Sequence, residues 1–222
     1  GVIFFMIIIE RRMTYYVGTS HRQLVLMFAL EAVYVGIIYL MLIYSDRFPE
    51  FISPAYWIPV TFFTFLFSLL IYEKLSLFLS QFNAVLMLFL FAYTPQAVLF
   101  LMLMTMITNI FVQRFRKRSD LPRVGFYIAI LASFLVAILE INVTQNSLNL
   151  VAVHVVQVFF TNIISIMLAM GMLPYLEQIF NITTDLKLLD YGDLNYPLMQ
   201  RLLHESPGTY YHSLMVSTMA EA

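Results

Sequence analysis

A histidine at position 212 stands out near the end of the chain, where a long apolar region has given way to polar sequence. The break at Pro207-Gly208 and the N-cap candidate Thr209 predict a new helix with His212 in its first turn. The apolar residues that share its helix face are Met215, Val216 and Met219. A neutral imidazole there is suited to bind a transition metal, although a histidine packed in a core fits the same pattern. A metal site needs several ligands, and no second ligand lies near His212 at a typical spacing.

Three further ionisable residues lie inside apolar stretches, namely Glu31, Glu140 and His154. A charge within a membrane span costs roughly 2.5–3.5 kcal/mol on insertion scales, so such residues are candidates for function. For Glu31 the alternatives are a functional role, a structural contact with a neighbouring polar side chain, or a position at the interface. Glu140 and His154 are expected near the outer ends of consecutive helices, where they could form a pair or contact water.

Uncharged polar residues also recur at helical spacing within two apolar stretches. One set comprises His154, Gln157, Thr161 and Ser165, and the other comprises Thr105, Thr108 and Asn109. Stripes of this kind usually join membrane helices through hydrogen bonds, and only occasionally line a pathway. We therefore expect helix–helix contacts at both stripes.

The composition indicates that membrane helices position these residues. The 222 residues are 61% hydrophobic and 11% charged, whereas soluble domains are about 45–50% apolar and about 25% charged. A soluble core of this size would leave much of that apolar surface exposed, so lipid must be its solvent. The net charge of −1 gives no indication of DNA binding, and the lack of cysteine excludes disulfides and thiolate metal sites within these residues.

Segment lengths predict an all-α, polytopic bundle of a half span and six full spans, because about 20 apolar residues cross a ~30 Å hydrocarbon core. The half span is Gly1 to Ile9, and we expect the chain to be a fragment that lacks both ends. Ser20 and Gln23 match a capping box before the first full span. The first full span is predicted at 23–44. Three more crossings are predicted within 55–112, with breaks near Glu73-Lys74 and Tyr93 to Gln96. The last two spans are predicted at about 120–141 and at 150–173, and Pro174 is expected to end the second of these.

The distribution of basic residues predicts the orientation of the bundle. All of the 12 Lys and Arg residues except Arg47 fall on one side of this topology, and cytoplasmic loops keep the excess of positive charge. The segment after Pro174 is therefore predicted to be cytoplasmic. The scarcity of Gly and Pro within the spans argues against the broken helices typical of transporters.

The segment that follows the bundle is predicted to be a linker of short helices separated by turns. Residues 174–180 are amphipathic and could lie along the membrane surface. Two further short helices are expected at 186–189 and 198–205. The residues expected to start, end or cap these helices, and so to couple bundle and tail, are Pro174, Asp185, Pro197, Pro207 and Gly208.

The tail sequence "PYLEQIFNITTDLKLLDYGDLNYPLMQRLLHESPGTYYHS", from residue 174, resembles a junction found in the bacterial seven-transmembrane HD hydrolases. In that family of cyclic di-AMP phosphodiesterases, P-[YF]-L-E-x-x-F-x-I-T-T-D-L-K-L-L-E links the membrane module to the catalytic module. The motifs D-L-N-H-P-L-L and E-A-P-G-T-Y-H-H-S follow it. "WIPV" at 57–60 and "RKRSDLPRVG" at 116–125 also resemble the family's membrane module, so the resemblance covers the whole chain.

By this resemblance His212 matches the second histidine of the family's "HHS", a ligand of a two-metal centre of iron or manganese. Tyr211 stands in place of the first histidine of that motif, and Tyr196 in place of the histidine of "LNHP". The resemblance implies that the remaining ligands, including the His-Asp dyad, follow Ala222 and that an extracellular sensing domain precedes the first span. Two metals about 3.5–4 Å apart activate a bridging water and clamp the oxygens of a phosphate.

The resulting hypothesis divides the chain into a transmembrane bundle at 1–173, a cytoplasmic amphipathic linker at 174–208 and the start of an HD hydrolase domain at 209–222. The bundle would be a sensor or anchor in the bacterial inner membrane, with the lipid bilayer as its partner. It would couple an external signal to hydrolysis of a cyclic dinucleotide, with cyclic di-AMP the substrate that the resemblance implies. The fragment itself is expected to be inactive and to hold no metal, and a homo-oligomer is left open. The alternative is a free-standing polytopic transporter or channel.

Cysteine labelling tests the predicted orientation, because these 222 residues contain no native cysteine. An impermeant thiol reagent applied to intact cells should label an Asn146→Cys variant, whose loop is expected outside, and should not label Ser119→Cys. Labelling at position 119 alone would reverse the orientation and remove the basis for a cytoplasmic tail.

Overall fold

The computed structural model describes residues 20–44, 54–71, 73–91, 95–114, 118–143, 148–192 and 196–221. Within these ranges every regular element is a helix, which confirms the predicted all-α fold. The half span expected at Gly1 to Ile9, and the loop around Arg47, lie outside the described residues.

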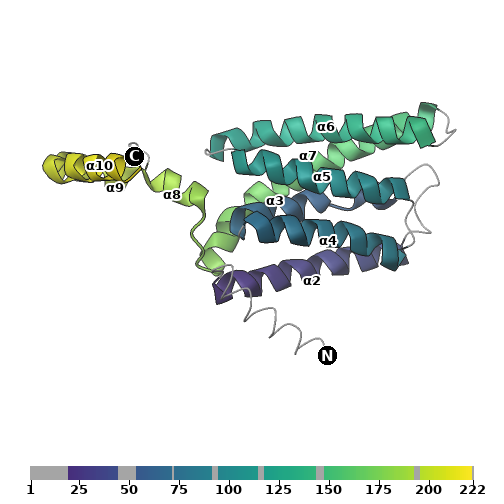
Figure 1. The fold of residues 1–222 in the computed structure, drawn as a ribbon, viewed down its shortest axis with the longest axis horizontal. Helices are drawn as coiled ribbons and strands as arrows, with labels where there is room; N and C mark the ends of the chain where they lie inside the picture. The colour runs from purple at the N-terminus through teal and green to yellow at the C-terminus, as the bar shows by residue number, and fades with distance from the viewer. Residues whose placement is uncertain are drawn as a thin grey trace.

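The described part of the chain forms a helix bundle with a helical tail. The bundle contains α2 (His21–Ile43), α3 (Val60–Leu70), α4 (Glu73–Phe91), α5 (Pro95–Arg114), α6 (Leu121–Val143) and α7 (Leu148–Ile179). Two 3-10 turns, η2 (Pro54–Trp57) and η3 (Arg118–Asp120), precede α3 and α6. Figure 1 shows the bundle helices side by side, with α8 (Asp185–Gly192), α9 (Pro197–Glu205) and α10 (Pro207–Glu221) leaving one end.

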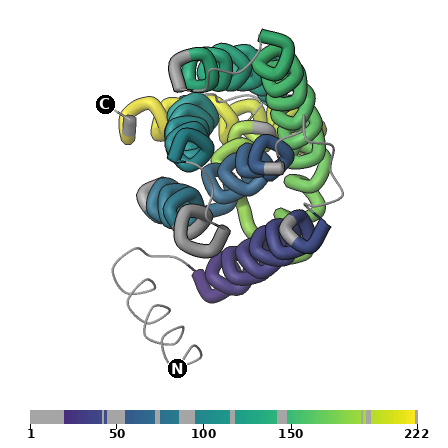
Figure 2. The backbone as a smooth tube through the Cα atoms, turned by 90° about the vertical axis from the view of Figure 1, so that its right-hand side faces the viewer, coloured from purple at the N-terminus to yellow at the C-terminus, as the bar shows by residue number. Residues whose placement is uncertain are grey.

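Helix α3 forms the centre of the bundle. It contacts α2, α4, α5 and α7, and Figure 2 shows it inside the ring made by the other bundle helices. Its sequence VTFFTFLFSLL is apolar around almost its whole circumference, as expected of a helix buried on all sides. The side chains of Phe63, Phe65, Leu66 and Phe67 are accordingly almost fully buried.

By length and composition, four of the described helices can cross a membrane, at residues 21–41, 95–114, 118–141 and 148–179. The sequence predicts six full spans, and this number is not reached among the described residues. The break predicted at Glu73-Lys74 agrees with the end of α3 and the start of α4. Helix α3 itself has 11 residues, a length of about 16 Å at 1.5 Å per residue.

The short length of α3 follows from the prolines that precede it. Pro54 begins a 3-10 turn that ends at Trp57, and the α-helix begins only at Val60. Pro59 occupies the N-cap position with φ −79° and ψ 54°, outside the helical region. Because proline also lacks a backbone N–H, it cannot continue the hydrogen bonds of a preceding turn, so the two pieces stay separate.

Helices α6 and α7 pack closely because small residues line their seam. A Cβ atom at Gly125 would lie 2.8 Å from Cγ2 of Ile166, so any other residue there would require the Ile166 side chain to shift. Ala129, Ala132 and Ala169 are fully buried. Small residues at such a seam let helix backbones approach, which is how helices associate in lipid.

Helix α7 does not end at Pro174, contrary to the prediction. It continues to Ile179 with Pro174 inside it, so residues 174–179 extend the helix and do not form a separate surface turn. Membrane helices tolerate such a proline because neighbouring groups satisfy the freed carbonyl. Helix α7 ends at Ile179, and the turn after it places Asn181 in the left-handed region, with φ 50°. Bonds from Asn181 N–H to Gln178 O and from Ile182 N–H to Glu177 O complete a Schellman motif.

The tail helices agree with the predicted linker except at its last break. Helix α8 covers the segment expected at 186–189, and α9 begins at Pro197 and ends at Glu205 as predicted. Pro207 and Gly208, however, are the first two residues of α10. Thr209 is therefore inside the helix and is not its N-cap. Proline is favoured at the first helical position because the missing N–H has no partner there. His212 therefore lies in the second turn of α10 and not in the first.

Candidate functional site

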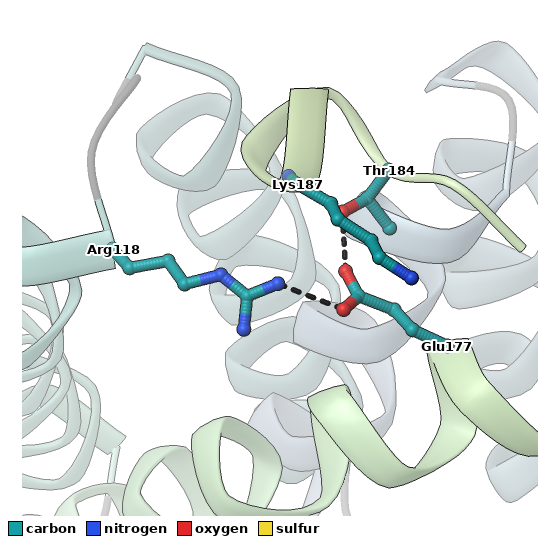
Figure 3. A network of polar contacts seen from close by, with 4 residues as sticks. All are labelled: Arg118, Glu177, Thr184 and Lys187. Atoms are coloured by element: carbon teal, nitrogen blue, oxygen red, sulfur yellow. Dashed lines mark hydrogen bonds and ion pairs between the residues drawn. The ribbon is translucent and has the colours of Figure 1, made fainter. Parts of the chain in front are cut away.

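The junction between the bundle and the tail is organised around one buried carboxylate. Glu177 near the end of α7 is 2% exposed, and its Oε2 accepts a hydrogen bond of 2.7 Å from Nη2 of Arg118 in η3. The Arg118 side chain is 31% exposed, so the pair lies where the bundle meets water. The contact joins the start of α6 to the end of α7, as Figure 3 shows.

The other oxygen of Glu177 connects the bundle to α8. Thr184 Oγ1 donates a hydrogen bond to Glu177 Oε1, and the same hydroxyl accepts the backbone N–H of Lys187 at 3.3 Å. Thr184 is thus the N-cap of α8, which satisfies one of the unpaired amides of its first turn. Three segments, η3, α7 and the start of α8, therefore meet at one side chain (Figure 3).

Arg118, Glu177 and Thr184 are not among the site residues predicted from the sequence. Arg118 and Glu177 are 59 residues apart, and no periodic pattern connects them. A signal was nevertheless present, because Arg118 belongs to "RKRSDLPRVG" and the other two belong to the tail motif. The structure brings together these two segments, which carried the family resemblance.

The opposite end of the bundle holds a second buried polar cluster. Nδ1 of His154 lies 2.7 Å from Oε2 of Glu140, and the hydroxyl of Tyr56 donates to Oε1 of Glu140 at 2.9 Å. Glu140 and His154 are each 8% exposed. Of the two alternatives, the pair is therefore correct and simple contact with water is wrong. Tyr56, which comes from η2, was not predicted as a member of this cluster.

Glu31 makes a structural contact with a neighbouring helix, one of the alternatives left open by the sequence. Nδ2 of Asn83 on α4 donates to both carboxylate oxygens of Glu31, at 2.9 and 3.0 Å. Nearer the start of α2, Nε2 of Gln23 donates to the carbonyl of Leu70 at 3.2 Å. These two contacts attach α2 to α4 and to α3.

The polar stripes join helices at several points. Nε2 of Gln81 on α4 donates to Oγ1 of Thr105 on α5 at 2.7 Å, and Nδ2 of Asn109 donates to Oγ of Ser76 at 3.3 Å. On the α7 side, Thr61 of α3 donates to Oδ1 of Asn162. Asn162 was not in the predicted stripe but adjoins Thr161. Gln157, Thr161 and Ser165 are buried as helix–helix contacts require.

The predicted metal ligand His212 is exposed, as are almost all residues of α10, including those on the helix face that it shares with Met215, Val216 and Met219. Met215, Val216 and Met219 on that face are each more than half exposed. Among the described residues no group of three or more His, Asp or Glu side chains could hold a metal ion. The candidate coupling residues are spread along the tail: Pro174 within α7, Asp185 at the start of α8, Pro197 at the start of α9, and Pro207 with Gly208 at the start of α10.

Comparison with known proteins places the chain in a family. A family model described as a 7TM receptor with intracellular HD hydrolase matches residues 1–184. The chain belongs to this family. It is therefore a membrane protein, and the transporter or channel alternative is not favoured. No solved structure matches the chain.

Two relatives are named cyclic-di-AMP phosphodiesterase PgpH. The one from Bacillus subtilis is 30% identical over 120 residues, which cover 51% of this chain and 16% of that protein. The one from Listeria monocytogenes is 27% identical over 174 residues, which cover 76% of this chain and 24% of that protein. An uncharacterised protein of Synechocystis is 44% identical over 55 residues, 25% of this chain and 7% of its own length. The chain thus spans a small part of each of these relatives.

Removing the hydroxyl of Tyr56 tests the energetic role of the cluster with Glu140. Tyr56→Phe keeps the ring contacts with Phe100 and His154 but removes the hydroxyl that donates to Glu140 Oε1. Since a hydrogen bond to a charged group contributes about 1.5–3 kcal/mol, the free energy of unfolding in detergent should fall by roughly that amount.

The matched control for this substitution is Tyr127→Phe, at an exposed tyrosine on α6. It should change the free energy of unfolding by no more than about 0.5 kcal/mol, as is usual for surface positions. Equal effects of the two substitutions would show that the hydroxyl of Tyr56 stabilises nothing.

Proposed function

We propose that this chain is the membrane and coupling module of a signalling phosphodiesterase that hydrolyses a cyclic dinucleotide. Two observations support the proposal. The family it belongs to is described by an intracellular HD hydrolase, and two relatives are named cyclic-di-AMP phosphodiesterases. Cyclic di-AMP is accordingly the proposed substrate. The bundle would sense a signal or anchor the protein in the membrane, and a hydrolase domain would perform the hydrolysis.

The single observation that carries a coupling role is the continuous connection from bundle to tail. Helix α7 extends past Pro174 to Ile179, and Glu177 then connects it directly to the cap of α8 through Thr184. We propose a bundle at 1–173, a coupling linker at 174–208 that includes the last turns of α7, and the start of the hydrolase domain at 209–222. An extracellular sensing domain before the bundle is part of the same proposal.

The proposed orientation places the tail in the cytoplasm of a bacterium, below its inner membrane. Its support is the clustering of basic residues at the end of the bundle from which the tail leaves. A hydrogen bond between Gln23 and Leu70 joins the start of α2 to the end of α3. The contact between Arg118 and Glu177 joins the start of α6 to the end of α7. Arg22, Arg118 and Arg123 are next to these contacts, and an excess of positive charge marks the cytoplasmic side.

His212 is the proposed metal ligand of the hydrolase domain. Its place on an exposed helix face suits a residue that points toward the remainder of a domain, and a ring on a rigid helix is a suitable ligand for iron or manganese. Among the described residues His212 could serve only as one ligand of a larger set, because no group of three or more ligands is present there. A metal pair would supply an activated water and neutralise charge on the phosphate. The part of the relatives that this chain does not cover could supply the other ligands.

Replacement of His212 in the full-length protein tests the proposal. His212→Ala should keep a cooperative thermal melt but lose bound metal and hydrolysis of cyclic di-AMP. Loss of groups that only support a ligand already costs about 10–100-fold in metal affinity or activity, so loss of the ligand should cost at least as much.

His204→Ala is the control, because His204 is exposed near the end of α9 and should leave melt, metal and turnover unchanged. If His212→Ala retains its metal and hydrolyses at the wild-type rate per folded molecule, His212 is a packing residue and the assignment is wrong. A full-length protein that hydrolyses no cyclic dinucleotide at all would refute the proposed activity itself.

A further inference from the structure

The contacts of Glu177 suggest a specific role for this residue beyond holding the fold together. We propose that Glu177 is a positioning residue: together with Arg118 and Thr184 it fixes the direction in which α8 leaves the bundle, and thereby the turnover of the hydrolase domain. The inference about turnover rests on the proposed function. The inference about direction does not.

The connection between α7 and α8 is short. Helix α7 ends at Ile179 and α8 begins at Asp185, and the left-handed residue Asn181 sets the turn between them. Ile182 and Leu186 are buried on either side of Thr184. Because the connection has so few residues, the anchor at Thr184 fixes where the axis of α8 starts.

The hydroxyl of Thr184 has two hydrogen-bond partners at once. It donates to the carboxylate of Glu177 and accepts the N–H of Lys187 in the first turn of α8. An N-cap contact orients the first turn of its helix. The direction of α8 therefore depends on a side chain that belongs to α7.

Glu177 is also connected to the start of α6. Its Oε2 is bound to Arg118 in η3, the turn that leads directly into α6. A buried carboxylate left without its cation is strongly unfavourable. A movement of α6 along α7 that breaks the contact with Arg118 would therefore displace Glu177 or admit water to its carboxylate, and either change would alter the bond to Thr184.

The exposed ion pair of α9 provides a contrast. Arg201 and Glu205 lie 3.1 Å apart with side chains 72% and 65% exposed, and such surface pairs contribute little to stability. Their contact lies within a single helix and connects no two elements. Glu205→Gln is therefore a matched control for the loss of a carboxylate in the tail.

Two substitutions break the proposed connection without removing its packing. Glu177→Gln keeps an acceptor for Thr184 but loses the charge that binds Arg118, and Thr184→Val keeps the volume but loses the hydroxyl. Thr184→Ser restores the hydroxyl and serves as the conservative rescue. Spin labels on Ile141→Cys and Leu188→Cys, both exposed, report the direction of α8 relative to the outer end of α6.

In nanodiscs the wild-type protein, Thr184→Ser and Glu205→Gln should give one narrow distance distribution between the labels. Glu177→Gln and Thr184→Val should broaden it or shift its maximum, while each variant keeps a cooperative melt. Narrow, unshifted distributions in both folded variants would overturn the inference about direction. If one of the two variants fails to fold, the other decides the question alone.

Hydrolysis by the full-length protein tests the second half of the inference. Because coupling between distant sites is typically about 5- to 150-fold, kcat for cyclic di-AMP in Glu177→Gln and Thr184→Val should change at least about fivefold, with KM and metal content unchanged. Wild-type kcat in both variants despite altered distances would refute the role in turnover. If the wild-type protein hydrolyses nothing, the proposed function fails, whereas the distances still test Glu177.

Discussion

A carboxylate removed from water at the edge of a membrane must be fully satisfied, and the arrangement of this chain's junction depends on that constraint. Glu177 is almost completely buried, so its two oxygens need donors that can be held in place. Arg118 supplies one from the start of α6, and Thr184 supplies the other from the cap of α8. The requirement of a single side chain therefore determines how two membrane helices and the first tail helix meet.

The rest of the bundle applies the same constraint in milder form. Its apolar surface faces lipid, and several of its buried polar groups are paired across helices, as in the cluster of Tyr56, Glu140 and His154. That cluster closes the end of the bundle opposite the tail, while Glu177 organises the end from which the tail leaves. Between them α3, too short to span, fills the centre with aromatic side chains. These contacts connect the helices of the bundle to one another, as the proposed coupling role requires.

Features that depend on local chemistry could be predicted from the sequence. The capping box at Ser20 and Gln23 is present, with Ser20 N–H bonded to Gln23 Oε1 at 2.9 Å, and Pro197 starts α9 as expected. Features that depend on packing could not. Pro174 stays within α7, where Leu173 and Leu176 on either side of it are buried. Arg118 meets Glu177 across a distance in sequence that no motif spacing encodes. For the pair of Glu140 and His154 the sequence indicated the partners but not their burial.

Hydrogen exchange of the protein in lipid nanodiscs tests the central claim most directly, namely that the junction is an ordered part of the bundle. Within residues 182–187, the hydrogen-bonded amides of Ile182 and Lys187 should exchange about as slowly as those of the buried α6 positions Ile128 and Ala132. The amides of α9, which has no buried residue, should exchange much faster. Exchange at 182–187 as fast as in α9 would show that the tail is loosely tethered, and would contradict the account of Glu177 as the residue that orients it.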